Sequence, residues 1–250
     1  MSPTLESSLA PVSPAERDLQ TAGQLQRMLL PPSPFAASGW TAVHTYEPAG
    51  VVSGDYLDLV PYGDRVHFML GDVSGKGVSA ALLMAQLHAM FRTLIPVQLP
   101  LDELLARASS LLCASSLPAQ YATLVTGYLA ADGHVALGNA GHLPPLIVGD
   151  SGQRTVQATG VPIGMFCQSD FSATQLSLGR NETLLMYTDG LSEGRNPSGE
   201  EYGVRVADVA HRAARSGLSD ILKAVVSDQA QFRGDSPNTD DMTVLAIRRC

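Results

Sequence analysis

The sequence predicts an α+β fold, because strand-like segments predominate and helical segments occur in consecutive pairs. Two observations lead to this fold class. Many of the short apolar segments are joined to the next by tight turns, as in antiparallel hairpins, and helical periodicity appears twice in neighbouring stretches. A parallel sheet would require strict alternation of strand and helix, which the chain does not show.

The first 34 residues differ in composition from the rest of the chain. Residues 1–14 are rich in Ser and Pro and have no apolar period, so we expect a flexible tail. From residue 15 to residue 30 apolar side chains recur at helical spacing, and prolines from Pro31 onward stop the helix. Residues 15–34 are therefore predicted to form an amphipathic helix and a proline-rich connector. No repeat or linker divides residues 35–250, which we expect to form one domain.

Three strands and two helices are expected in the first half of this domain. The strands lie in TAVHTYEP (41–48), DYLDLVP (55–61) and RVHFMLGDV (65–73), and a turn at residues 62–64 joins the last two. Helical periodicity follows over residues 77–94 and 101–113. The second helix carries Asp102 and Glu103 in its first turn, where carboxylates favour the helix dipole.

Hairpins dominate the second half. Residues 131–134 are predicted to form a turn, and helices are expected at 204–216 and 219–232. The expected strands are YATLVTGYLA (121–130), HVALGNAG (134–141), PPLIVG (144–149), FSATQLSL (171–178), ETLLMYTDG (182–190) and MTVLAIRR (242–249).

Composition and charge argue against some function classes. The 250 residues are 45% hydrophobic and 16% charged, which is ordinary for a globular protein. With 16 Lys and Arg against 24 Asp and Glu the formal charge is −8, so no basic field is available to bind nucleic acid or an anionic membrane. No apolar run approaches the ~18 residues of a membrane span, and the N-terminus lacks a signal-peptide core, so we expect a cytoplasmic protein without a membrane partner.

The three cysteines show no metal or redox motif. Cys113, Cys167 and Cys250 are odd in number and widely spaced, without a CxxC pattern or a disulfide framework. Cys113 lies in an apolar helical pattern, and Cys167 lacks the CxxxxxR loop of a cysteine nucleophile. We interpret all three as non-catalytic thiols in a reducing compartment.

The most informative feature is a set of aspartates placed where predicted strands end in tight turns. They are Asp55 in SGD, Asp72 in GD, Asp189 in TDG, and the neighbours Asp240 and Asp241 in TDD. Carboxylates are hard ligands that suit Mg²⁺ or Mn²⁺, and a pair of such ions requires several of them. The glycines around Asp72 allow a sharp turn that brings a main-chain carbonyl, that of Val73, to the same ion. Taken singly, each Asp is more simply a turn or cap residue. Taken together, they favour a metal site.

The ordered motifs resemble a known family, the PP2C-like serine/threonine phosphatases of the bacterial stress- and sporulation-regulator branch. The resemblance covers most of the chain. It is carried by LQRMLLPP (25–32), SGDYLD (53–58), GDVSGKGVSAALLMA (71–85), NAGHLPPLIV (139–148), VPIGMF (161–166), MYTDGLSEGRN (186–196) and DDMTVLAIRR (240–249). Where this branch commonly has two glycines before the first aspartate, the chain has Ser53 and Gly54.

The resemblance implies an αββα sandwich, in which two antiparallel sheets pack face to face with helices outside and a centre of two Mn²⁺ or Mg²⁺ ions lies at one end. It implies that Asp55 and Asp72 flank the ions together with the Val73 carbonyl, and that Asp189 and Asp240 hold the second ion. Asp241 is the alternative to Asp240, and we choose Asp240 because neighbours on an extended segment point to opposite faces. The ions would activate a water that attacks phosphorus directly, so no catalytic side chain beyond this water is expected.

Partners follow from the same resemblance. The implied substrate is phosphoserine or phosphothreonine on a regulatory protein, an anti-sigma-factor antagonist. The helix over residues 15–30 implies an activating partner or a homodimer. Lys76 is expected to contact substrate phosphate or to cap its turn, and we assign no role to His44 or His142. Two other functions stay open: a phosphatase-like binding module with little turnover, and another two-metal hydrolase such as a phosphodiesterase or nuclease.

Overall fold

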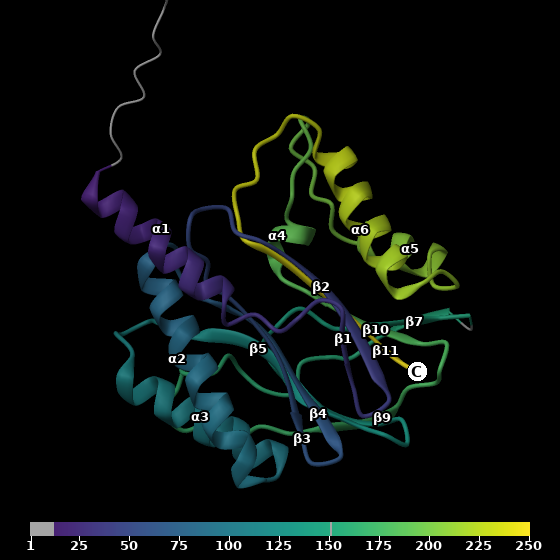
Figure 1. Ribbon diagram of the computed structural model, residues 1–250, viewed down its shortest axis with the longest axis horizontal. Coiled ribbons are helices and arrows are strands. Elements are labelled where there is room, and N and C mark those ends of the chain that lie inside the picture. Colours follow the sequence, from purple (N-terminus) through teal and green to yellow (C-terminus); the bar gives the residue numbers. More distant parts are fainter. Residues whose placement is uncertain (1–12, 151) are drawn as a thin grey trace, which may run out of the picture.

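The computed structural model describes residues 13–150 and 152–250. Two antiparallel sheets pack face to face, and helices cover both outer faces (Figure 1). The α+β class predicted from the sequence pattern and the αββα sandwich implied by the family resemblance are therefore confirmed. All strand pairs within the two sheets are antiparallel.

The strands divide between the sheets by topology rather than by chain order. The six-stranded sheet has the order β1 (Phe35–Ala37), β2 (Trp40–Glu47), β11 (Met242–Arg249), β10 (Thr183–Tyr187), β7 (Leu146–Gly149) and β8 (Gly152–Thr155). The five-stranded sheet has the order β3 (Asp55–Tyr62), β4 (Arg65–Val73), β5 (Ala122–Ala130), β6 (His134–Ala140) and β9 (Thr174–Ser177).

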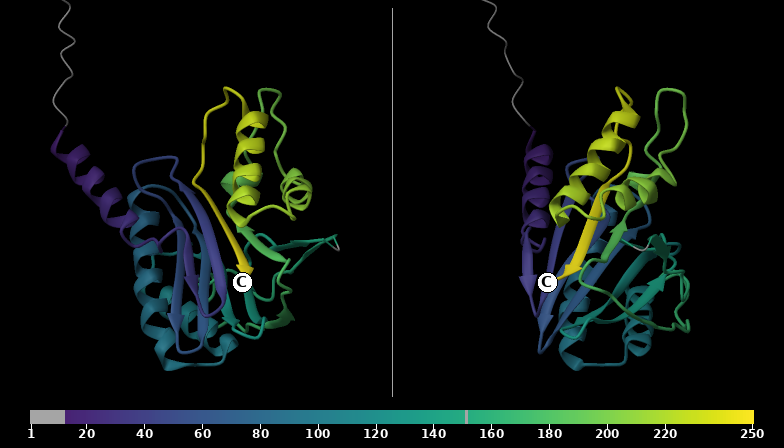
Figure 2. Two further views of the ribbon diagram at one scale, coloured as in Figure 1. Left: turned by 45° about the vertical axis from the view of Figure 1, so that its right-hand side comes forward. Right: turned by 90° about the vertical axis from the view of Figure 1, so that its right-hand side faces the viewer.

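Each sheet is covered by its own pair of helices (Figure 2). On the five-stranded sheet, α2 (Val78–Leu94) packs on β3 and β4, and α3 (Leu101–Ser115) packs on β6, with the 3₁₀ turn η1 (Ile95–Val97) after α2. On the six-stranded sheet, α5 (Arg205–Arg212) packs on β7, and α6 (Leu218–Arg233) packs on β2 and β11. A short helix, α4 (Asp189–Ser192), follows β10, and α1 (Pro14–Arg27) precedes the domain.

Side-chain alternation along the strands produces three buried layers. On β4, Phe68 and Leu70 point into the layer between the sheets, whereas Met69 and Val73 point toward α2. A third layer lies between the six-stranded sheet and the helices α5 and α6. Trp40 joins the two sheets directly, because its buried indole Nε1 donates a hydrogen bond of 2.9 Å to the Ala130 carbonyl at the end of β5.

The predicted helices and strands are observed, with small differences at their ends. The predicted flexible tail falls mostly on residues 1–12, outside the described residues, but its last two residues belong to the helix start. Ser13 caps α1 through a reciprocal pair of hydrogen bonds with Glu16, and Pro14 is the first helical residue. The sequence did not predict β1, β8, η1 or α4, all of which are four residues or shorter.

The interpretation of Cys113 and Cys167 as free thiols is wrong. They form a disulfide between α3 and the loop before β9, with Cα atoms 5.2 Å apart across a sequence separation of 54 residues. Cys250 is free and exposed. Since a disulfide is typical of oxidising compartments, the cysteines no longer support a reducing one. The cytoplasmic location stays a prediction.

The segment Val78–Val97 is long and apolar enough to cross a membrane by length and composition, with a mean hydropathy of 1.4 over 20 residues. The sequence argument predicted a helix over residues 77–94 but did not count it as a candidate span, because polar residues interrupt its apolar run. In the fold it is a core helix, since Leu83, Leu87 and Phe91 are buried against the five-stranded sheet. Core helices of this kind pass the same test, so the finding is weak evidence for a membrane span.

Candidate metal centre

Five aspartates meet at one end of the sandwich, which we call the acidic end: Asp55, Asp72, Asp189, Asp240 and Asp241. Asp55 begins β3 and lies directly opposite Asp72 near the end of β4. Opposed residues of an antiparallel pair share a face with Cβ atoms roughly 5 Å apart, and like charges at such positions destabilise the sheet. A cation between the strands would relieve this repulsion.

Burial and mutual repulsion change the ionisation of this pair. Burial, followed by the charges of Asp189, Asp240 and Asp241, raises the pKa of Asp72 to about 7. Burial also raises the pKa of Asp55 well above its usual range, and the charges of Asp72 and Asp241 add to the shift. Carboxylates that resist ionisation alone are suited to hold a divalent cation, because the cation restores the charged form.

Asp55 is the most deeply buried of the five, with 1% of its surface exposed. Its Oδ2 accepts hydrogen bonds from the hydroxyls of Thr188 and Thr243, the first at 2.9 Å. Its Oδ1 is buried and has no hydrogen-bond partner in the part of the chain that the structure describes. A buried carboxylate oxygen without a partner is costly, and a hard cation is the ligand that satisfies it. This orphaned oxygen shows that the residues present fit a metal.

Asp189 is held close to the chain that carries Asp240 and Asp241. It follows β10 and opens α4, and the next residue is Gly190. A Cβ on Gly190 would lie 2.1 Å from the Asp241 carbonyl oxygen, so only glycine allows the two segments to approach this closely. Burial and the charge of Asp240 raise the pKa of Asp189.

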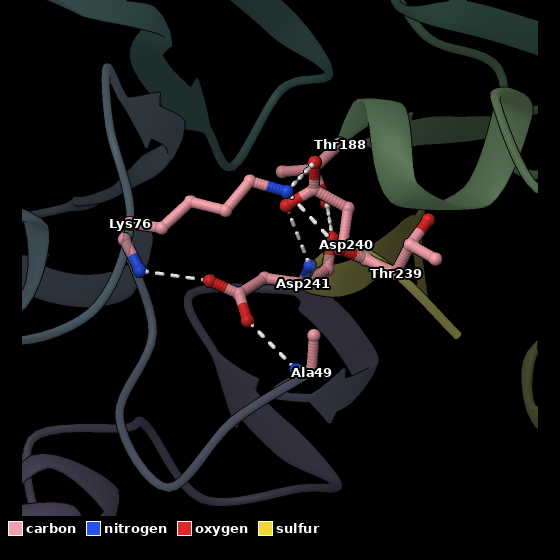
Figure 3. Close-up of polar contacts among 7 residues, drawn as sticks. Ala49, Lys76, Thr188, Thr239, Asp240 and Asp241 are labelled. Atoms are coloured by element: carbon pink, nitrogen blue, oxygen red, sulfur yellow. Dashed lines mark hydrogen bonds and ion pairs between the residues drawn. The ribbon is translucent and has the colours of Figure 1, made fainter. Parts of the chain in front are cut away.

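Asp240 and Asp241 have different partners, as Figure 3 shows. The Asp241 carboxylate accepts the backbone N–H of Ala49 at 2.8 Å and that of Gly54 at 2.9 Å, so it ties the loop before β3 to the start of β11. Both Asp241 carboxylate oxygens thus accept backbone N–H groups. Asp240 Oδ2 instead accepts the Lys76 ammonium at 2.8 Å, a cation that another cation can replace.

The Val73 carbonyl belongs to the same end. The Val73 N–H donates to the Gly54 carbonyl at 3.3 Å, which joins the end of β4 to the residue before Asp55. A Cβ on Gly54 would lie 3.1 Å from the Val73 oxygen and 3.1 Å from the Ala80 Cβ. Glycine at position 54 therefore keeps the approach to this carbonyl open.

Within residues 13–150 and 152–250, no group of three His, Cys, Asp or Glu side chains is arranged to hold a metal ion as it stands. The structure brings Asp55, Asp72, Asp189 and Asp240 to one end without closing them into a coordination shell. The choice of these four and of Val73 as ligands stays a prediction.

Three residues of this end were missed by the sequence argument. Gln26 of α1 is buried and forms two hydrogen bonds with the Ser53 backbone, at 2.7 and 2.9 Å. The Ser53 hydroxyl in turn accepts the Asp55 N–H at 3.0 Å. The signal for Gln26 was a polar residue on the apolar stripe of its helix. The other two are Thr188, which directly precedes Asp189, and Thr243, which lies three residues after Asp240. Asp241, the alternative to Asp240, and His142, to which no role was assigned, also belong to this end.

His142 lies beside the acidic end as a neutral side chain. Burial lowers its pKa to about 4. Its Nε2 donates to the Tyr187 carbonyl at 3.1 Å, which leaves Nδ1 to accept the Thr123 hydroxyl at 2.8 Å. His142, Asp72 and Asp189 line a cavity of about 280 Å³. This cavity is large enough for a phosphate group next to two of the candidate ligands.

Comparison with known proteins shows which family this chain matches. The model of the family described as Stage II sporulation protein E (SpoIIE) matches residues 62–250. The match includes Asp72, Asp189 and Asp240, and it begins after Asp55.

Two relatives align along most of the chain. Protein IcfG of Synechocystis is 28% identical over 93% of this chain and 41% of its own length. Phosphoserine phosphatase RsbP of Bacillus subtilis is 31% identical over 93% of this chain and 58% of its own length. The chain therefore spans about half the length of these relatives.

Solved structures show the same fold. The SiaA-PP2C domain of Pseudomonas aeruginosa superposes with a TM-score of 0.84 at 22% identity, over 94% of this chain and 97% of that one. RsbX in complex with magnesium superposes with a TM-score of 0.65 at 11% identity, over 87% of this chain and 99% of that one.

Proposed function

The chain belongs to the SpoIIE family of PP2C-type phosphatases, and from this premise we propose that it is a metal-dependent phosphoprotein phosphatase that hydrolyses phosphoserine and phosphothreonine. The observation that carries the proposal is the acidic end, where the β3–β4 hairpin sets Asp55 opposite Asp72 and the buried Asp55 Oδ1 has no hydrogen-bond partner among the described residues. The 31% identity to a phosphoserine phosphatase supports the same substrate class.

Asp55, Asp72, Asp189, Asp240 and the Val73 carbonyl are the proposed ligands of two Mn²⁺ or Mg²⁺ ions. Such ions supply an activated water and offset the charge on the phosphoryl oxygens. The magnesium complex of RsbX supports this ion type.

The chain's own residues position these ligands. Thr188 and Thr243 fix the Asp55 carboxylate through Oδ2 and leave Oδ1 for the ion. Asp241 and Gln26 hold the loop that precedes Asp55. His142 is neutral and bonded at both nitrogens, so it is a poor candidate for the general acid at neutral pH.

We propose a phosphorylated regulatory protein, an anti-sigma-factor antagonist, as the substrate. We also propose that an activating partner or a second copy binds through α1. An exposed apolar groove of about 500 Å³ between α1 and α2 supports the second proposal, and its lining includes Leu25, Met28 and Leu82, which are 59%, 79% and 67% exposed. A surface of this kind is typical of an interaction site.

One observation favours the alternative of a phosphatase-like binding module. Asp240, a proposed ligand, is already paired with the Lys76 ammonium at 2.8 Å. A module of this kind would bind a phosphorylated partner without turnover.

The test is hydrolysis by the purified chain of a phosphoserine peptide, an aryl phosphate monoester and an aryl phosphate diester, each with Mn²⁺, Mg²⁺ or EDTA. We expect metal-dependent release of phosphate from both monoesters, unaffected by thiol-blocking reagents. Turnover confined to the diester would identify another two-metal hydrolase. Tight binding of the phosphopeptide without release of phosphate under any metal would identify the binding module.

A further inference from the structure

We infer that Lys76 is a built-in competitor of the metal: its ammonium occupies the Asp240 oxygen that a divalent cation must take, and so it sets the metal affinity of the acidic end. This inference rests on the proposed function. It assigns to Lys76 a role different from contact with substrate phosphate or capping of its own turn.

The contacts of Lys76 are the first step of the argument. Its Nζ donates to Asp240 Oδ2 at 2.8 Å and to the Thr239 carbonyl at 3.0 Å, so it spans from the turn after β4 to the segment before β11 (Figure 3). The other Asp240 oxygen, Oδ1, accepts the N–H of Asp241 at 3.0 Å. Oδ2 is therefore the oxygen that Asp240 can offer to a metal ion, and Lys76 holds it.

The strength of this contact is the second step. The Lys76 side chain is 67% exposed and that of Asp240 is 40% exposed. Exposed ion pairs contribute little to stability, whereas a dication at the same place interacts with several carboxylates at once. Lys76 can thus neutralise Asp240 reversibly but cannot exclude a metal.

The backbone around Lys76 is the third step. Gly75 and Gly77 flank it with φ angles of +96° and +71°, a region that favours glycine. A Cβ built on either glycine would meet no atom of the described residues within 4 Å, so the packed strands do not confine the turn. The side chain is therefore free to swing away when a dication takes Oδ2, without disturbing the packed strands.

The experiment measures Mn²⁺ affinity by isothermal titration calorimetry in the absence of substrate. Lys76→Met is expected to bind Mn²⁺ about tenfold more tightly than the natural chain, because it removes both the competitor and a nearby positive charge. Lys76→Arg keeps the charge and is expected to stay within about threefold. Lys223 on α6 is the other lysine of the chain, and Lys223→Met is the control for the same change in net charge.

A second measurement uses the natural chain. Acylation of the two lysines by an amine-reactive ester is followed by mass spectrometry with and without Mn²⁺. Mn²⁺ is expected to increase labelling of Lys76 relative to Lys223, because the ion releases the ammonium from Asp240.

The outcomes separate this inference from the function on which it rests. Unchanged or weaker Mn²⁺ binding by Lys76→Met, in a chain that does bind Mn²⁺, would overturn the competition and leave the phosphatase proposal intact. Absence of Mn²⁺ binding by the natural chain and by every variant would overturn both.

Discussion

Strand β3 carries two buried carboxylates only three residues apart, and their surroundings are opposite in kind. Asp58 points toward α2 and receives two hydrogen bonds of 2.7 Å from Arg92, with His88 at 3.5 Å. Asp55 points toward the other sheet and faces Asp72, and its donors among the described residues are two hydroxyl groups. Asp58 is thus neutralised by a cationic side chain of the protein, whereas Asp55 has no cationic partner among the described residues.

The contrast has an energetic meaning. A paired buried charge contributes to stability only while both partners are present. An unpaired buried charge lowers the stability of the fold while no ligand is bound. Binding of a ligand then stabilises the folded state. The two aspartates should therefore respond in opposite ways to the loss of their neighbours.

The largest expected effect is a loss of phosphate release when Asp72, which faces the unpaired Asp55, is replaced. Asp72→Asn should lower metal-dependent phosphate release by at least about 100-fold, since even residues that only orient metal ligands cost 10- to 100-fold. In EDTA the same variant should melt at a higher temperature than the natural chain, because it removes the repulsion between Asp72 and Asp55. Asp64→Asn in the exposed β3–β4 turn is the matched control for both assays. Full activity of Asp72→Asn would remove Asp72 from the ligand set.

On the paired side, Arg92→Met should destabilise the fold by about 3 kcal/mol, because it leaves Asp58 buried without its cation. This value is at the low end for broken buried pairs, since the Arg92 side chain is 44% exposed. Urea denaturation measures the change, and Arg107→Met on the exposed face of α3 is the control. Equal unfolding free energies for the two variants would mean that Asp58 does not depend on Arg92.

The pH dependence sharpens the same contrast. The pKa of Asp72 is raised in the fold from 3.8 to about 7, so the folded chain binds more protons than the unfolded chain between these values. Without metal, stability should therefore fall as pH rises from about 4 to about 7. Thermal melts in EDTA across this window are expected to show a decrease of several degrees, which Asp72→Asn reduces. A melting temperature that rises over this window would contradict the raised pKa.

A smaller effect is expected for a residue that only supports Asp55. Gln26→Ala removes both hydrogen bonds to the Ser53 backbone and should weaken Mn²⁺ binding and phosphate release about tenfold. Gln24→Ala, on the exposed face of the same helix, is the control and should behave as the natural chain. Identical Mn²⁺ titrations for the two variants would show that α1 does not position the loop before Asp55.

The sequence predicted most of the fold because its long strands and helices carry strong periodic signals. Segments such as RVHFMLGDV and VSAALLMAQLHAMFRTL show which face is buried without reference to the rest of the chain. The strand β8 (GQRT) gives no such signal, because its residues are largely exposed and follow no apolar alternation. This strand forms because the chain turns back and pairs with β7, and the residues of β8 alone do not indicate that pairing.

The sequence predicted site residues most directly where an aspartate follows an apolar strand and adjoins a glycine. Asp72 and Asp189 each follow an apolar strand beside a glycine, and this local pattern marked them. The contact of Thr243 with Asp55 spans 188 residues, and the Cys113–Cys167 disulfide spans 54. Such pairings depend on the register of the sheets and the placement of loops, about which a single sequence carries no local signal.

The hydrogen bond between Trp40 and Ala130 gives the protein a native optical probe. Trp40 is the single tryptophan of the chain, it is 1% exposed, and it lies at the end of the sandwich away from Asp55 and Asp72. Its emission therefore monitors whether the two sheets remain apposed, without an added label. A red shift in that emission would signal separation of the sheets. A structural change confined to the acidic end would not shift the emission maximum.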